Sequence, residues 1–373
     1  MPRPYRHTTP VPQKSATGQV AAVYTQMKAD FLLADGPLMG LSPAPEVLAA
    51  TWALLREAEI VGTAARADKE AVASTVSLAN RCPFCTEAHA LLAHGAGAHE
   101  LAEAARAGRA PADRRRAALL DWAAATRSPG APAPSTPPFP PAQTPEFVGT
   151  ALVTHFINRM VTSLLDEEAL LPNAVRRSQY VRRAAALTIG SAARRNPAPG
   201  AGLAVLAGPP PVGPPPVWAG EGPIGTAYLA LRAAATAGGE LLDPAARAAV
   251  IDAVADWDGG HPQLGGDPTG AAVAGLPEPD RPGARLALLA ALAPYRITDG
   301  DVAAWRAAEA RRASRTGDGR GADGGGTGGD GTDGGGTDGG DGALTRLLAF
   351  GAMAAVLRVE TWISSGVHPA PTA

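Results

Sequence analysis

The sequence predicts an all-α protein. Alanine- and leucine-rich runs with the three-to-four-residue spacing of a helix face dominate the 373-residue chain, and the alternating patterns that are typical of strands are almost absent. Helix-start signals also precede several of these runs. The main runs cover residues 45–62, 68–79, 112–127, 144–165 and 243–257.

The first residues of three runs predict where their helices begin. Ser42 stands before a proline-containing first turn in "SPAPEVLAATWALLREAEI", and Asp68 precedes "KEAVASTV". The dipeptide Asp243-Pro244 places a capping residue before a first-turn proline. Since such side chains accept hydrogen bonds from the free N–H groups of a helix, we expect helices to start at these points.

Segments rich in proline and glycine divide a chain that is long enough for two domains. We expect an extended loop at residues 128–144 and a linker at 196–222, so that one helical domain covers residues 1–195 and another covers 223–373. Residues 316–342 are mainly glycine and aspartate with almost nothing to bury, which predicts a disordered insertion.

The two predicted domains look like copies of one helical unit. The stretch "WALLREAEIVG" at 52–62 resembles "YLALRAAATAG" at 228–238, and later segments match in the same order. We therefore predict a tandem duplication whose second copy is degenerate. In this alignment Glu70, Cys82, Cys85 and His89 stand opposite Ala248, Gly260, Gln263 and Asp267.

The composition argues against partners that bind through a strong positive charge, such as nucleic acids and acidic membranes. The 33 basic residues nearly balance the 35 acidic ones, so the net charge of -2 provides no field to gather nucleic acid or an acidic membrane. No stretch offers about 18 uninterrupted apolar residues, and the start has no apolar signal segment. We expect a cytoplasmic protein, in which a lone cysteine pair is catalytic or metal-binding rather than a structural staple.

Both cysteines lie in "NRCPFCTEAH", residues 80–89. If a helix begins at Pro83, the spacings of three and four residues bring Cys82, Cys85 and His89 onto one face. The helix N-terminus favours the thiolate and lowers the thiol pKa from its free value of about 8.5. A thiolate attacks a peroxide or a disulfide, and a second thiol three residues away can then close a disulfide, with no cofactor required.

Glu70 stands twelve residues before Cys82 on the preceding predicted helix. An αα-hairpin that turns at "NRC" would bring Glu70 towards His89. A carboxylate in that position orients the imidazole and supplies a proton path.

Two other interpretations of the pair are open. Cys82, Cys85 and His89 could bind zinc, although such a site needs a fourth ligand or an open water position and the chain has no other cysteine. Alternatively, the protein is a structural or regulatory helical assembly whose pair senses oxidation without catalytic turnover.

The pattern Glu-x11-Cys-x2-Cys-x3-His, filled by Glu70, Cys82, Cys85 and His89, resembles the signature of the alkylhydroperoxidase D (AhpD)-like branch of the carboxymuconolactone decarboxylase superfamily. The flanking stretches "LSPAPEVLAATWALLREAEIVG" and "FVGTALVTHFINRMVTSLL" are similar to helices of that superfamily. The resemblance covers roughly residues 20–170. One departure is Phe84, where the best-known member has a histidine that contributes to the relay.

The resemblance implies an all-helical fold and a peroxidase that reduces alkyl hydroperoxides without a cofactor. In that family's pattern Cys85 is peroxidatic, Cys82 resolves it as a disulfide, and Glu70 with His89 relays protons. It also implies an external dithiol reductant, either a lipoyl-bearing or a thioredoxin-like protein, and a homo-oligomer in which a trimer of fused units resembles a hexamer.

Overall fold

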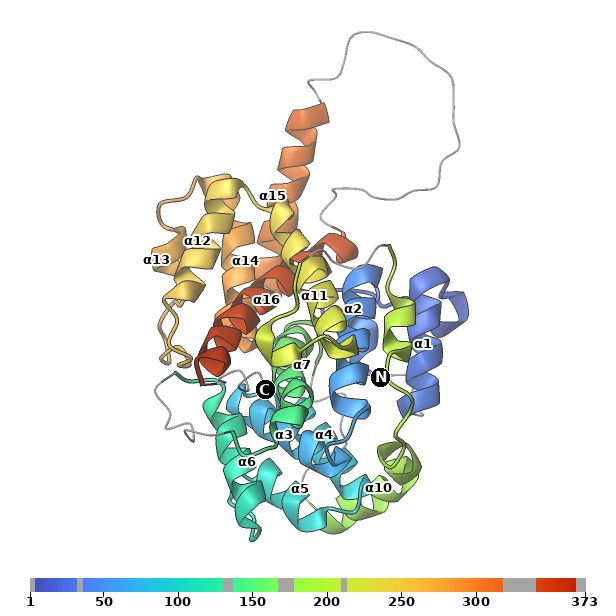
Figure 1. Cartoon of the computed structure of the whole chain (residues 1–373). Coiled ribbons are helices and arrows are strands. Elements are labelled where there is room, and N and C mark those ends of the chain that lie inside the picture. Colours follow the sequence, from blue (N-terminus) through green and yellow to red (C-terminus); the bar gives the residue numbers. More distant parts are fainter. Residues whose placement is uncertain are drawn as a thin grey trace.

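The computed structural model describes residues 4–31, 36–129, 137–166, 178–208, 213–317 and 340–366. Over these ranges the protein is built from α-helices and short 3-10 turns and has no strand; one isolated antiparallel bridge joins Tyr5 to Leu165 (Figure 1). The prediction of an all-α protein is therefore confirmed.

Residues 4–208, here called the N-terminal part, hold eight of the α-helices. Their bounds are α1 Gly18–Phe31, α2 Pro45–Leu55, α3 Arg66–Ala79, α4 Pro83–Gly95, α5 His99–Arg106, α6 Arg114–Ala125, α7 Thr144–Leu164 and α10 Gln179–Ala193. The predicted run at 45–62 is not one regular helix, because a π-helical turn, η3 (Arg56–Ile60), follows α2 directly.

Residues 213–366, the C-terminal part, hold the remaining described helices. These are α11 Pro223–Thr236, α12 Pro244–Ala255, α13 Gly270–Val273, α14 Arg281–Leu292, α15 Asp299–Gly317 and α16 Asp341–Gly366. Most of the glycine- and aspartate-rich segment lies outside the described residues, at 318–339, and its two ends belong to α15 and α16.

One of the three predicted helix starts is confirmed and two are wrong. Asp243 caps α12 by accepting a hydrogen bond from the Ala245 N–H at 2.9 Å. Asp68 lies inside α3, where its buried carboxylate pairs with two arginines of α6. Ser42 lies three residues before Pro45, the first residue of α2, and its hydroxyl accepts a hydrogen bond from the Val11 N–H at 2.7 Å, because the N-terminal segment packs there.

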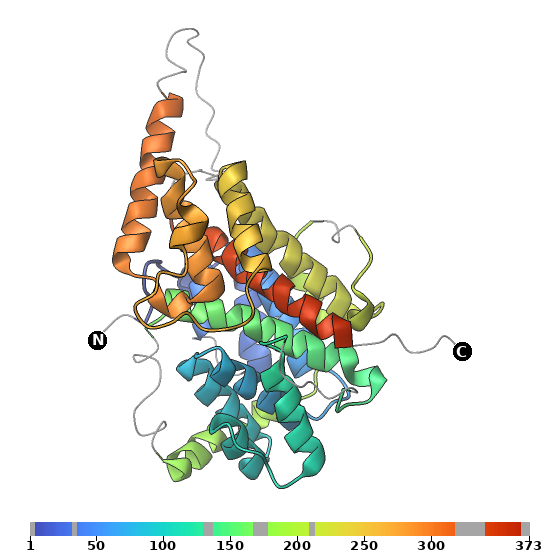
Figure 2. The same ribbon diagram turned by 90° about the vertical axis from the view of Figure 1, so that its left-hand side faces the viewer.

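The two parts share one hydrophobic core. Helix α7 lies near the centre of the molecule and packs against α16, while α2 packs against α11 (Figures 1 and 2). The core includes Leu48 and Phe156 of the N-terminal part and Leu288 and Val356 of the C-terminal part. The duplication and the domain boundaries stay predictions.

The predicted linker at 196–222 is held against this core where it is described. Val205 and the Trp218 indole are buried, and Trp218 Nε1 donates a hydrogen bond of 2.9 Å to Glu360 of α16. Residues 209–212 lie outside the described part, as do residues 130–136 of the predicted loop.

By length and composition alone, the stretch Asp341–Ser364 of α16 could cross a membrane. Most of it is buried within the protein, as is common for a central core helix. The expected absence of a membrane partner stays a prediction.

Candidate active site

A tight hairpin of α3 and α4 carries the two cysteines. Helix α4 begins at Pro83 with Cys82 as its N-cap residue, as the sequence predicted. The turn is fixed by a hydrogen bond of 3.0 Å from the Cys82 N–H to the Ser77 carbonyl, and Arg81 takes a positive φ of 58°. Further along, the Ser74 hydroxyl donates to the Thr86 carbonyl at 3.0 Å, so the helices run antiparallel.

Cys82 and Cys85 are joined by a disulfide, with their Cα atoms 5.5 Å apart. That separation lies in the usual range for a disulfide. Cys82 has no exposed surface of its own and Cys85 is 3% exposed. A cleft of about 350 Å³, lined by Leu78, Arg81 and Arg106 among others, reaches Cys82.

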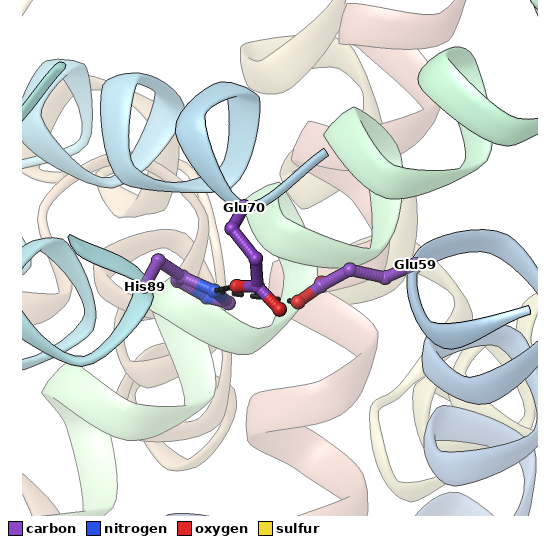
Figure 3. Close-up of side chains that lie close together, drawn as sticks. All are labelled: Glu59, Glu70 and His89. Carbon is purple, nitrogen blue, oxygen red and sulfur yellow. Dashed lines mark hydrogen bonds and ion pairs between the residues drawn. The ribbon is translucent and has the colours of Figure 1, made fainter. Parts of the chain in front are cut away.

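Glu70 and His89 meet across the hairpin. Glu70 Oε2 lies 2.8 Å from His89 Nδ1 in a direct hydrogen bond, and Figure 3 shows the two side chains converging from α3 and α4. Glu70 has no exposed surface, and the His89 side chain is 14% exposed. Because His89 stands four residues after Cys85 on α4, the oriented imidazole lies one helical turn beyond that cysteine.

A third residue, Glu59, completes the group and was missed by the sequence analysis. It comes from the π-helical turn η3, and its Oε1 lies 3.3 Å from His89 Nδ1 (Figure 3). Its side chain has no exposed surface, and neither carboxylate oxygen has a hydrogen-bond donor within the described residues. One signal could have found it: Glu59 falls four residues after Leu55 and seven after Trp52, on the apolar side of the run.

Glu59, Glu70 and His89 shift the pKa values of one another. Burial alone would lower the pKa of His89, but Glu59 and Glu70 outweigh it and raise this pKa to about 10. Burial would raise the pKa of Glu70, yet Arg66 and His89 hold it at about 2. Burial, and then the charge of Glu70, raises the pKa of Glu59.

At neutral pH these shifts make His89 an imidazolium and Glu70 a carboxylate. Glu59 is then the carboxyl group that takes up a proton first. Arg66 Nε holds the second Glu70 oxygen at 2.5 Å, so the carboxylate that orients His89 is itself fixed on both sides.

A buried ion pair holds the segment between η3 and α3. Lys69 Nζ lies 2.9 Å from Glu146 Oε2 and donates to the Val61 carbonyl, while Glu146 accepts from the N–H groups of Thr63 and Ala64. Gly62 passes over this carboxylate with a φ of 123°, where an added Cβ would lie 2.2 Å from Glu146 Oε2. The segment therefore fixes Glu59 relative to Glu70.

The same three side chains are also potential metal ligands. One oxygen each of Glu59 and Glu70 and one nitrogen of His89 lie within 4.8 Å of one another, a set that could hold a divalent cation. The adjacent Arg66 guanidinium already binds Glu70, and its positive charge opposes a cation there. The zinc site predicted from the sequence is a different set, Cys82, Cys85 and His89. Its two sulfur atoms are joined in the disulfide.

Comparison with known proteins identified one strong relationship. The chain is 36% identical over 364 residues to a protein of Mycobacterium tuberculosis (strain ATCC 25618 / H37Rv) that is named alkyl hydroperoxide reductase. The alignment spans 97% of this chain and 96% of that protein. No family model matches the chain, and no solved structure matches it.

Proposed function

This chain belongs to the AhpD-like family of alkyl hydroperoxide reductases, and we propose that it is a thiol-dependent peroxidase acting through Cys82 and Cys85. The observation that carries the proposal is the hydrogen bond between Glu70 and His89. This bond orients His89 as a proton donor one helical turn beyond Cys85. Cys85 and Cys82 in turn form a pair that closes into a disulfide. The name of the relative supports an alkyl hydroperoxide as the oxidant.

The oxidative half-reaction uses both cysteines. The Cys85 thiolate attacks the distal oxygen of the hydroperoxide, the O–O bond breaks, and Cys85 becomes a sulfenic acid while an alkoxide leaves. Cys82 then attacks the Cys85 sulfur, which forms the disulfide and releases water. One hydroperoxide and one dithiol thus give one alcohol, one water molecule and one disulfide.

His89 acts as the acid in this scheme. Its raised pKa keeps the ring protonated at neutral pH, so it stabilises the Cys85 thiolate by charge and gives its proton to the departing alkoxide. Glu70 holds the ring through Nδ1, and Glu59 is the nearby carboxyl group that can return a proton. The proposed relay consists of His89, Glu70 and Glu59. It does not require a histidine at the position of Phe84.

In this scheme the reductive half-reaction begins at Cys82, because that residue lines the cleft beside the hairpin, and the cleft has to widen since Cys82 has no exposed surface. A thiolate of an external dithiol attacks the Cys82 sulfur and expels Cys85 as a thiolate beside the His89 imidazolium. The second external thiol then releases Cys82, and two electrons have entered the pair. A lipoyl-bearing or thioredoxin-like protein has the required dithiol, and a homotrimer in the cytoplasm is the expected assembly and location.

The test is turnover of cumene hydroperoxide with dihydrolipoamide as the reductant. We expect the native protein to turn over many equivalents of peroxide and Cys85→Ser to turn over none. Unchanged turnover in Cys85→Ser would remove Cys85 as the peroxidatic residue. A native protein that forms the disulfide once and stops would instead support the redox-sensing interpretation, and stoichiometric zinc in protein purified without chelators would support a metal site.

A further inference from the structure

A second group of buried polar side chains lies at the C-terminal end of α3, beside the turn of the cysteine hairpin, where the two parts of the chain meet. Arg127, which follows α6, and Arg159 of α7 are 7% and 2% exposed. Both guanidinium groups lie against the indole of Trp257, with their central carbons 5.2 and 5.5 Å from the ring centre. Two positive charges are therefore buried beside a single aromatic ring.

The acceptors that hold these arginines are neutral. Arg159 donates from Nε to the Ala291 carbonyl at 2.9 Å and from Nη1 to the His155 carbonyl at 2.8 Å. Arg127 Nη1 donates to Asn80 Oδ1 at 2.6 Å. These bonds fix the arginines in place, but the acceptors carry no negative charge.

The two histidines of the group are neutral as well. His261 Nε2 donates to the Ala79 carbonyl at 2.9 Å, which leaves Nδ1 to accept from Arg127 Nη2 at 3.2 Å. His155 Nδ1 accepts from Asn80 Nδ2 at 2.9 Å. Burial, followed by the charge of Arg127, lowers the pKa of His261 to about 4, and burial holds the pKa of His155 well below its usual value.

The absence of a counter-ion distinguishes Arg127 and Arg159 from the other buried arginines. Arg56 and Arg182 are comparably buried, and each forms ion pairs with carboxylates. In the part of the chain that the structure describes, neither Arg127 nor Arg159 pairs with a carboxylate. Burying an unpaired charge is costly, so a pair of them calls for a negative charge nearby.

A small cavity is available between these groups. Its lining includes Asn80, Arg127, Arg159, His261 and Tyr295, and it offers about 10 Å³ of free space. That space holds one particle of about the size of a water molecule. Arg127 Nε is buried and has no acceptor within the described residues, so one strong donor of the lining is unused.

We propose that this cavity binds one small inorganic anion of about the size of chloride. The two unpaired guanidinium groups favour an anion over a water molecule, and the small volume favours a monatomic anion over sulfate, phosphate and organic carboxylates. Asn80 belongs to the turn that precedes Cys82 and accepts a hydrogen bond from Arg127. Since residues of the C-terminal part also line the cavity, the bound anion stabilises the packing of the cysteine hairpin against that part. The proposal does not depend on the peroxidase activity.

The direct test uses the native protein and bromide as an anion that diffraction can identify. Crystals soaked in sodium bromide are measured at the bromine absorption edge. We expect an anomalous peak in the cavity between Arg127 and Arg159. A cavity that holds water or nothing at saturating bromide would overturn the proposal.

A solution experiment tests the same site by linkage. Thermal unfolding is compared in sodium chloride and in sodium gluconate at equal ionic strength, because gluconate is too large for the cavity. At chloride concentrations ten times its dissociation constant, the unfolding equilibrium constant should fall roughly elevenfold. Arg127→Gln should lose this response, whereas the exposed control Arg109→Gln should keep it; an equal response in all three proteins would mean a general salt effect and refute the site.

Discussion

Glu59 and Glu70 both favour the protonated form of His89. Replacing Glu70 by glutamine removes one of these two charges and keeps the shape of the side chain that orients the ring. Glu70 Oε2 lies 2.8 Å from His89 Nδ1, closer than Glu59 Oε1 at 3.3 Å. In Glu70→Gln the repulsion between the two carboxyl groups is gone, so Glu59 carries the remaining negative charge. We therefore expect His89 to lose part of its preference for the protonated form.

The size of this effect follows from the shift in the native protein. A rise in the pKa of His89 from 6.5 to about 10 corresponds to about 5 kcal/mol in favour of the imidazolium. If Glu70, the nearer carboxylate, supplies about half of this free energy, Glu70→Gln loses about 2 to 3 kcal/mol of the preference for the imidazolium. The alkaline limb of the peroxidase rate should then move down by about 1.5 to 2 pH units.

The assay is the second-order rate constant for oxidation of the reduced protein by cumene hydroperoxide, measured by stopped flow from pH 6 to about pH 10. At about pH 9 we expect Glu70→Gln to be roughly four- to tenfold slower than the native protein. The matched control is Glu221→Gln, because Glu221 is exposed and lies outside the site. Unfolding curves for all three proteins establish that they are folded over this range.

An unchanged alkaline limb in Glu70→Gln, with the variant folded, would refute the role of the carboxylate. A uniform loss of rate at every pH would also contradict the reasoning, because it would mean misplacement of His89 rather than loss of its charge. Only a pH-dependent loss fits the coupling between Glu70 and His89.

Three further outcomes are expected. Cys82→Ser should consume one equivalent of peroxide and stop at a Cys85 sulfenic acid that dimedone traps, and mass spectrometry would show the adduct; continued turnover would mean that Cys82 is not the resolving cysteine. Lys69→Met should lower the free energy of unfolding in urea by about 3 kcal/mol, because Glu146 is left as an unpaired buried carboxylate; a loss below about 1 kcal/mol would contradict this. The folded-state pKa of Glu70, about 2 against 4.5, contributes about 3 kcal/mol of stability that is present above pH 4.5 and lost as the pH falls through about 2; acid unfolding should show this loss in the native protein and not in Glu70→Gln.

The helices were predictable because their signals are local. The spacing of apolar residues found the helical runs, and Asp243 caps α12 where the sequence placed it. The errors arise where distant residues intervene: Asp68 is drawn into the interior by arginines of α6, and Ser42 binds the N-terminal segment. No local pattern revealed that both parts share one core.

The same distinction between local signals and distant contacts applies to the residues of the site. Cys85 and His89 lie on α4 and Cys82 is its N-cap residue, so their spacing predicted a common face. A short hairpin was enough to bring Glu70 to His89. Glu59 required the tertiary structure, because a π-helical turn aims it at His89 from a third element. The arginine pair beside the turn of the hairpin likewise depends on packing between the two parts.

We propose that Cys82 and Cys85 reduce an alkyl hydroperoxide as one dithiol unit. The most direct measurement mixes the fully reduced native protein with one equivalent of cumene hydroperoxide and quantifies thiols, cumyl alcohol and the Cys82–Cys85 disulfide within a single turnover. We predict that two thiols disappear for each alcohol formed and that dihydrolipoamide restores both. Intact peroxide beside two free thiols, or alcohol formed with no loss of thiols, would contradict the account.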